Sequence, residues 1–186
     1  VQLSDSGLGR TLSMESFIRV LIVDNNPADR TLYRRHLDAD SHRNYEVAEA
    51  ATAEEASHML RECEYDCILL DYRLPGTNGL DFLRYLQESS DSEMTPVIMV
   101  TGEGDENVAV KCLRKGAVDY VPKDKVSPGV FERAIGNAVV QAEMKRTIDE
   151  QTRSLRSANE ELRTRNEEIQ RFYHTVSHEI KTPLTA

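Results

Sequence analysis

Two carboxylates, an amide, a hydroxyl and an ammonium group stand at the ends of short apolar runs in this sequence. Asp24 and Asn25 end the first run, Asp71 the third and Thr101 the fourth, and Lys123 follows the fifth. Oxygen donors of this kind suit Mg²⁺, which takes one or two carboxylates and keeps several waters. With one carboxylate on the metal, another can attack phosphorus, while Lys and Thr groups hold the phosphoryl oxygens. Asp71 is the best candidate nucleophile, because it ends the most apolar run.

These residues need elements that bring the ends of the runs together. Three of the runs are rich in Val or Ile, as buried parallel strands are, and the five predicted strands cover Ile18–Val23, Val47–Ala51, Cys67–Leu70, Val97–Val100 and Val118–Val121. Polar caps and amphipathic spacing predict intervening helices at Ala28–Asp38, Ala53–Glu64, Asn78–Glu88 and Asp105–Lys115, with a last helix from Pro128. This alternation predicts a doubly wound, parallel α/β sheet. The site of such a sheet lies beyond the carboxyl ends of its strands.

The charge of the chain is unevenly distributed. The formal net charge is −9, and residues 17–127 hold 13 Lys and Arg against 21 Asp and Glu, whereas residues 128–186 hold nine of each. An acidic globular half argues against nucleic-acid binding, which needs basic patches, and suits a site that gathers cations. No apolar run approaches the roughly 18 residues of a membrane span, and no secretory signal opens the chain. A cytoplasmic protein without a membrane partner is therefore expected.

The three cysteines predict a reducing compartment. Cys63, Cys67 and Cys112 stand in apolar surroundings and are odd in number, so we expect buried free thiols. Cys63 and Cys67 have no second pair that would complete a zinc site.

One long helix is predicted from residue 128 onward, since no Gly or Pro occurs between Gly136 and Pro183. Aliphatic residues recur every seven positions, and asparagines fall at heptad position a when the aliphatic series occupies d. The d series is Ile148, Leu155, Leu162, Ile169 and Val176, and the a-position asparagines are Asn159 and Asn166. This pattern is typical of a parallel two-stranded coiled coil and predicts a homodimer. The alternative is a single amphipathic helix that lies on its own domain.

The last fifteen residues, FYHTVSHEIKTPLTA, place His178 directly before Glu179. Neighbouring positions do not share a helix face, so the two residues lack the spacing of a metal pair. They suit an exposed imidazole that accepts a group while a carboxylate manages its proton. In the heptad register His178 falls at position f, which faces solvent, and Pro183 is expected to bend the helix beyond it. The alternative is an ordinary surface histidine.

Residues of about 17–140 resemble the receiver domain of two-component response regulators, through IRVLIVDNNPADR, CILLDYRLPGTNGLDFL, PVIMVTGEGD and GAVDYVPKD. The resemblance implies a flavodoxin-like (βα)5 fold whose phosphoacceptor is Asp71. It implies that Mg²⁺ binds Asp24, Asp71 and the backbone carbonyl of Arg73. A histidine kinase or phosphotransfer protein upstream would donate the phosphoryl group.

The same resemblance implies roles for three further residues. Lys123 would contact the phosphoryl group, and Thr101 and Tyr120 would form a switch pair. The family usually has two adjacent acids after the first strand, whereas Asn25 stands at the second position here. An amide oxygen can still bind a metal, but the lost charge predicts a weakened Mg²⁺ site. The alternative function is therefore a non-phosphorylated pseudo-receiver that serves as a dimerisation or protein-interaction module.

The run SHEIKTPL resembles the H-box of sensor histidine kinases, which implies that His178 is a second phosphoacceptor. Together the two resemblances indicate a truncated hybrid histidine kinase. Its expected parts are a flexible segment or cloning remnant (1–16), the receiver core (17–127), a last receiver helix continuing as a coiled coil (128–170) and the start of the phosphoacceptor helix (171–186). No Gly-rich phosphate loop occurs, so no kinase activity is expected of this chain alone. A third alternative is a phosphatase that uses Asp71 as its nucleophile. Such an enzyme would need a second Asp two residues later as the general acid, but Arg73 occupies that position.

Overall fold

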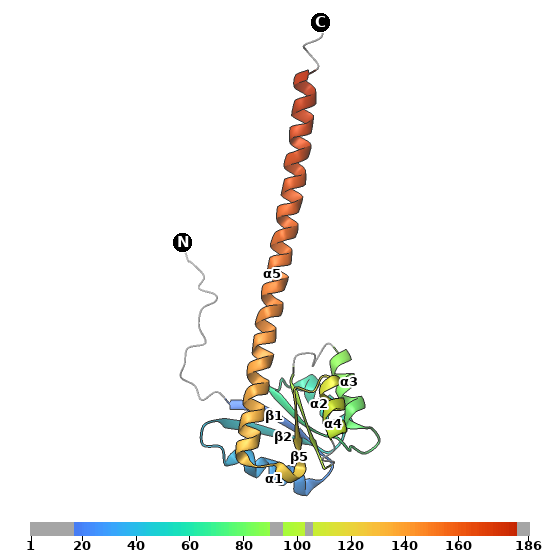
Figure 1. Cartoon of the computed structure of the whole chain (residues 1–186), viewed down its shortest axis with the longest axis vertical. Coiled ribbons are helices and arrows are strands. Elements are labelled where there is room, and N and C mark those ends of the chain that lie inside the picture. The colour runs from blue at the N-terminus through green and yellow to red at the C-terminus, as the bar shows by residue number, and fades with distance from the viewer. Residues whose placement is uncertain (1–16, 90–94, 103–105, 182–186) are drawn as a thin grey trace. The chain divides into compact units, whose positions relative to one another are not determined.

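The computed structural model describes residues 17–89, 95–102 and 106–181, and it contains one five-stranded parallel sheet (Figure 1). The strand order is β2-β1-β3-β4-β5. The strands are β1 (Phe17–Val23), β2 (Asn44–Ala50), β3 (Cys67–Asp71), β4 (Val97–Thr101) and β5 (Asp119–Pro122). The helices are α1 (Pro27–Asp38), α2 (Ala53–Glu62), α3 (Gly79–Glu88), α4 (Glu106–Arg114), the 3₁₀ turn η1 (Lys123–Lys125) and α5 (Pro128–Lys181). This is the doubly wound α/β fold predicted from the sequence.

The sheet is covered on both faces, which explains why β3 and β4 are apolar up to their last residues, Asp71 and Thr101. Every residue of β3 and of β4 is buried. Helices α1 and α5 cover one face of the sheet, and α2, α3 and α4 cover the other (Figure 1). Alternate residues of β3 serve the two cores: Ile68 and Leu70 pack towards α2, α3 and α4, whereas Cys67 and Leu69 pack towards α1 and α5. Strand β3 is the central strand of the sheet, and Asp71 is its last residue, as predicted.

Polar caps fix the points at which helices leave the sheet. The Asn26 side chain accepts a hydrogen bond from the Ala28 amide at 3.0 Å, and Pro27 occupies the first helical position of α1. In α2 the Thr52 hydroxyl accepts from the Glu55 amide at 3.2 Å, as the predicted capping signal requires. These caps set the short connections that follow β1 and β2.

Two details of the sequence interpretation are wrong. Strand β2 begins at Asn44, three residues before the predicted start at Val47, because β1 pairs with it from Phe17 onward. Cys63 is exposed, not buried, because α2 ends at Glu62 and Cys63 is its C-cap. The other two cysteines are buried free thiols, and burial raises the pKa of Cys67. The expected flexible segment 1–16 lies outside the described residues.

The chain divides into two compact units, and α5 contributes to both. The first unit extends to Ala142, and the second begins at Glu143. Within the first unit, α5 buries Phe131, Ala134, Ile135 and Ala138 against the sheet. None of the helices in the described part of the chain is long and apolar enough to cross a lipid bilayer.

Candidate functional site

Among the described residues, three that are polar or charged are buried as whole residues, and all three are predicted site residues. Asp24 directly follows β1, Asp71 ends β3 and Thr101 ends β4, with exposed fractions of 1%, 5% and 1%. These strands are parallel neighbours in the order β1-β3-β4, so their carboxyl ends lie along one edge. Because burying a charged group costs free energy unless it is paired, this concentration makes the edge the candidate functional site.

Lys123 connects the acidic residues of this edge. It follows β5 at the start of η1. Its ammonium nitrogen lies 2.8 Å from Asp24 Oδ2, 2.7 Å from Asp29 Oδ2 and 3.1 Å from Asp71 Oδ1. Asp71, Asp24 and Lys123 therefore meet, as the proposed chemistry at the strand ends requires.

The ionisation of these groups reflects both burial and charge. Burial, followed by the negative charge of Asp24, raises the pKa of Asp71, and Lys123 and a hydrogen bond from the Arg73 amide only partly offset the rise. Burial lowers the pKa of Lys123, but its hydrogen bonds to Asp24 and Asp29 outweigh that effect and leave the pKa raised. Burial also raises the pKa of Tyr33, whose hydroxyl lies 3.5 Å from Asp24 Oδ2. The surroundings of Lys123 thus favour its charged form, whereas those of Asp71 disfavour its charged form.

Asp71 is reachable from solvent although it is largely buried. It lies in an open pocket of about 850 Å³, which is lined by Asn25, Asn26, Asp29, Asp71, Arg73, Leu74, Pro75, Gly102 and Lys123. The possible side-chain metal donors here are carboxylate and amide oxygens, from the lining residues Asn25, Asn26, Asp29 and Asp71 and from Asp24 beside Lys123. An oxygen-only set with access to water fits Mg²⁺, which retains part of its hydration shell. The predicted metal-binding residues Asn25 and Arg73 both line the pocket.

The turn after β3 holds the Asp71 backbone tightly. The Gly79 amide donates to Tyr72 O at 2.9 Å, and Arg73 and Asn78 form an isolated bridge across the turn. A Cβ atom at Gly79 would lie 2.3 Å from the Asp71 carbonyl oxygen, where no side chain fits. The glycine therefore allows α3 to begin directly against the end of the central strand.

Sequence reasoning missed Asp29 as a site residue. Asp29 lies in the first turn of α1, five positions after Asp24, and it reaches Lys123 from there. Its position was the signal that could have identified Asp29 as a site residue. Helix α1 starts beside the site, so an acid in its first turn can face the site. Acids are common in the first turn of a helix because they interact favourably with the helix dipole. The presence of Asp29 there therefore did not by itself indicate a site residue.

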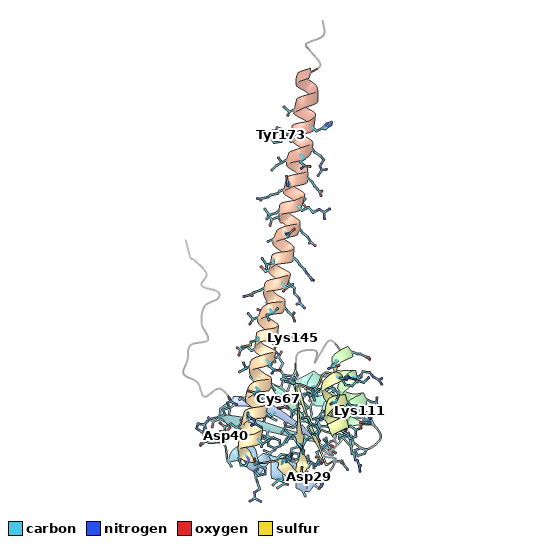
Figure 2. The ribbon with its side chains drawn as sticks, viewed as in Figure 1. Asp29, Asp40, Cys67, Lys111, Lys145 and Tyr173 are labelled. Atoms are coloured by element: carbon cyan, nitrogen blue, oxygen red, sulfur yellow. The ribbon has the colours of Figure 1, made fainter. Side chains whose placement is uncertain are left out.

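The remaining predicted site residues lie on β5 and α5. Tyr120 is partly buried and packs against the core beneath α2, α3 and α4, one strand away from Thr101. His178 and Glu179 lie on the backbone of α5, but their side chains are outside the described residues, as is the predicted bend at Pro183. Along the second unit, Ile148, Leu155, Leu162 and Ile169 are 61%, 71%, 67% and 53% exposed. In Figure 2 the side chains of Lys145 and Tyr173 project outward from this helix.

Comparison with known proteins identifies one family. The model of the response regulator receiver domain matches residues 20–134. The phosphate regulon transcriptional regulatory protein PhoB of Rhizobium meliloti (strain 1021) is 33% identical over 115 residues, which are 62% of this chain and 49% of that protein. The transcriptional regulatory protein ResD of Bacillus subtilis (strain 168) is 36% identical over 105 residues, which are 56% of this chain and 41% of that protein. The chain thus spans about half or less of the length of these two relatives.

A solved structure shares the fold of this chain. The CheY-like response regulator receiver domain protein from Methanospirillum hungatei JF-1 superimposes with a TM-score of 0.60 at 28% sequence identity. The match covers 70% of this chain and 99% of that chain.

Proposed function

Because the chain belongs to the response regulator receiver domain family, we propose that it accepts a phosphoryl group on Asp71 as part of a phosphorelay. The observation that carries the proposal is the position of the Asp71 carboxylate, which lines an open pocket with its Oδ1 atom 3.1 Å from the Lys123 ammonium. The donor is a phosphohistidine of an upstream histidine kinase or phosphotransfer protein.

In the proposed reaction, an Asp71 carboxylate oxygen attacks phosphorus, and the bond from phosphorus to the donor breaks. The donor atom leaves with the electron pair, so an acyl phosphate forms without any redox step. Mg²⁺, when bound, neutralises charge on the phosphoryl oxygens. The metal would be held by Asp24, Asn25 and the backbone carbonyl of Arg73. The Asp71 carboxylate would also bind it.

The other residues of the pocket act on the phosphoryl group through position and charge. Lys123 pairs with the phosphoryl oxygens, because it already lies within hydrogen-bond distance of Asp71. The Thr101 hydroxyl donates a hydrogen bond to the same group, and Tyr120, the other member of the switch pair, rearranges with it. The rearrangement of Thr101 and Tyr120 changes the surface formed by β4 and β5.

The proposal extends to the second unit of the chain. We assign the exposed aliphatic series to the interface of a parallel coiled coil with a second copy of the chain, since a stripe that repeats every seven residues is self-complementary. Asn159 and Asn166 would fix the register. This dimer would present His178 as the phosphoacceptor of a histidine kinase core, and the receiver would regulate that core through α5.

A second candidate function is a pseudo-receiver, a protein-interaction module that is not phosphorylated. Asn25 favours it, because a neutral amide replaces the second acid of the family pattern and reduces the charge that attracts Mg²⁺. The module would still dimerise through α5.

Beryllofluoride, which mimics a phosphoryl group on a carboxylate, separates the two functions. We expect the full chain to bind it only when Mg²⁺ is present, and the Asp71→Asn variant to bind none under the same conditions. ¹⁹F NMR detects the bound fluorides directly. Absence of an Asp71-dependent signal at millimolar Mg²⁺ would refute phosphorylation and support the pseudo-receiver.

A further inference from the structure

Three carboxylates surround the ammonium group of Lys123, and one of them has no role in the proposed reaction. Asp24 and Asp71 are the expected metal ligand and phosphoacceptor. The third carboxylate belongs to Asp29, which makes the shortest of the three contacts at 2.7 Å. Asp29 is labelled in Figure 2 at the lower edge of the globular unit.

The usual reasons for an acid at this position do not account for its contacts. An acid in the first turn of a helix interacts favourably with the helix dipole, and at the third position it commonly accepts the amide hydrogen of the N-cap residue. Here the Asn26 amide donates to Asp24 Oδ1 at 2.8 Å instead. The Asp29 carboxylate reaches Lys123 and lines the pocket that contains Asp71.

The charge of the pocket depends on Asp29. Within the cluster around Lys123, three carboxylates and one ammonium group leave a net charge of −2, and Arg73 adds a positive charge elsewhere in the pocket lining. Without Asp29 the net charge of the cluster would be −1, because Asn25 contributes none. Asp29 therefore restores the charge that the family pattern normally obtains from a second acid after the first strand.

Asp29 also affects the residues that would bind the metal. The Lys123 ammonium has three hydrogens, and in this structure each of three carboxylates takes one contact. Removing Asp29 would leave the ammonium to Asp24 and Asp71 alone. It would then compete more strongly with Mg²⁺ for the same oxygens.

We propose that Asp29 is a positioning residue of the cation site, which compensates for Asn25 by its charge and by drawing Lys123 away from Asp24 and Asp71. The inference deepens the proposed function and rests on it, since it concerns the same pocket. It requires no direct bond between Asp29 and the metal.

Calorimetric titration of the full chain with Mg²⁺ tests the inference without any phosphoryl donor. We expect Asp29→Asn to weaken Mg²⁺ binding about tenfold, the order expected when one unit charge beside a divalent cation is removed in an open pocket. Asp29→Glu, which keeps the charge, should stay within about threefold of the unmodified chain. Asp38→Asn is the matched control, because Asp38 is an exposed acid at the far end of the same helix.

The decisive variant is the double substitution Asn25→Asp with Asp29→Asn. It moves the carboxylate to the family position, so we expect it to regain the Mg²⁺ affinity of the unmodified chain. Circular dichroism with a chelator present checks that each variant is folded. The inference is overturned if Asp29→Asn binds Mg²⁺ as tightly as the unmodified chain, if the double variant stays weak, or if the unmodified chain binds no Mg²⁺.

Failure of this inference can be told apart from failure of the proposed function. If Asp29→Asn forms the Asp71 beryllofluoride adduct with an unchanged Mg²⁺ dependence, Asp29 has no such role and the function stands. If the unmodified chain binds Mg²⁺ in an Asp29-dependent way but forms no adduct, the cation site stands and phosphorylation is refuted.

Discussion

At the scale of single residues, the environment of Asp71 disfavours the charged form that the proposed reaction requires. Burial and the charge of Asp24 both raise the pKa of Asp71. An ionised Asp71 at neutral pH therefore makes the free energy of folding less favourable than a neutral side chain would. Lys123 moderates this cost by bonding to both carboxylates.

The substitution Asp71→Asn should therefore stabilise the protein. Since folding raises the pKa of Asp71, its favourable contribution is complete only below the unfolded value near 3.8 and is lost as pH rises through the folded value. Urea unfolding at pH 7 with a chelator should show a larger free energy of unfolding for the variant, because Asn keeps an acceptor for Lys123 but carries no charge. The difference should shrink as pH falls towards 4. A variant that is less stable than the unmodified chain, or a difference independent of pH, would contradict this assignment.

At the scale of elements, the site depends on how closely α3 approaches the end of β3. The Gly79→Ala substitution would place a methyl group 2.3 Å from the Asp71 carbonyl oxygen, so we expect a loss of about 1–3 kcal/mol of stability from overpacking. Urea unfolding measures this loss.

Gly129→Ala is the control for that substitution. Gly129 lies in the first turn of α5, and a methyl group there would meet no neighbouring side chain or strand of the described residues within 4 Å. Alanine should therefore be neutral or stabilise the helix by up to about 1 kcal/mol. Equal effects of the two substitutions would mean that the turn after β3 can relax, and that the close approach does not fix Asp71.

The second element that permits a prediction is the part of α5 beyond Ala142. If its exposed aliphatic stripe forms the proposed coiled coil, Leu155→Ser should weaken dimerisation at least about tenfold, because each protomer loses a buried leucine. Sedimentation velocity over a range of concentrations measures the effect. Glu160→Ser, at the outward-facing heptad position b, should leave the dimer intact. A chain that remains monomeric throughout, or a Leu155→Ser variant that dimerises normally, would rule out the stripe as an interface.

The main elements could be predicted from sequence because their signals are local. Apolar runs gave the strands, and caps such as Asn26-Pro27 and Thr52 gave the helix starts. The start of β2 was missed because Tyr45 stands alone between the polar residues Asn44 and Glu46, and the pairing of this segment with β1 is a tertiary contact. Asp29 was missed for the same reason, since its partner Lys123 is 94 residues away along the chain.

At the scale of the whole molecule, two compact units share one helix. The first unit contains the pocket with Asp71, and the second carries the exposed stripe and the backbone that leads to His178. The family is established for the first unit, and the proposed regulation of a histidine kinase core depends on phosphorylation there.

The most direct test is therefore to incubate the full chain with acetyl phosphate and Mg²⁺ and to measure its intact mass. The account predicts a gain of one phosphoryl group that requires Mg²⁺, is labile to hydroxylamine as an acyl phosphate is, and disappears in Asp71→Asn. A chain that gains no mass, or that gains the same mass in the Asp71→Asn variant, would contradict it.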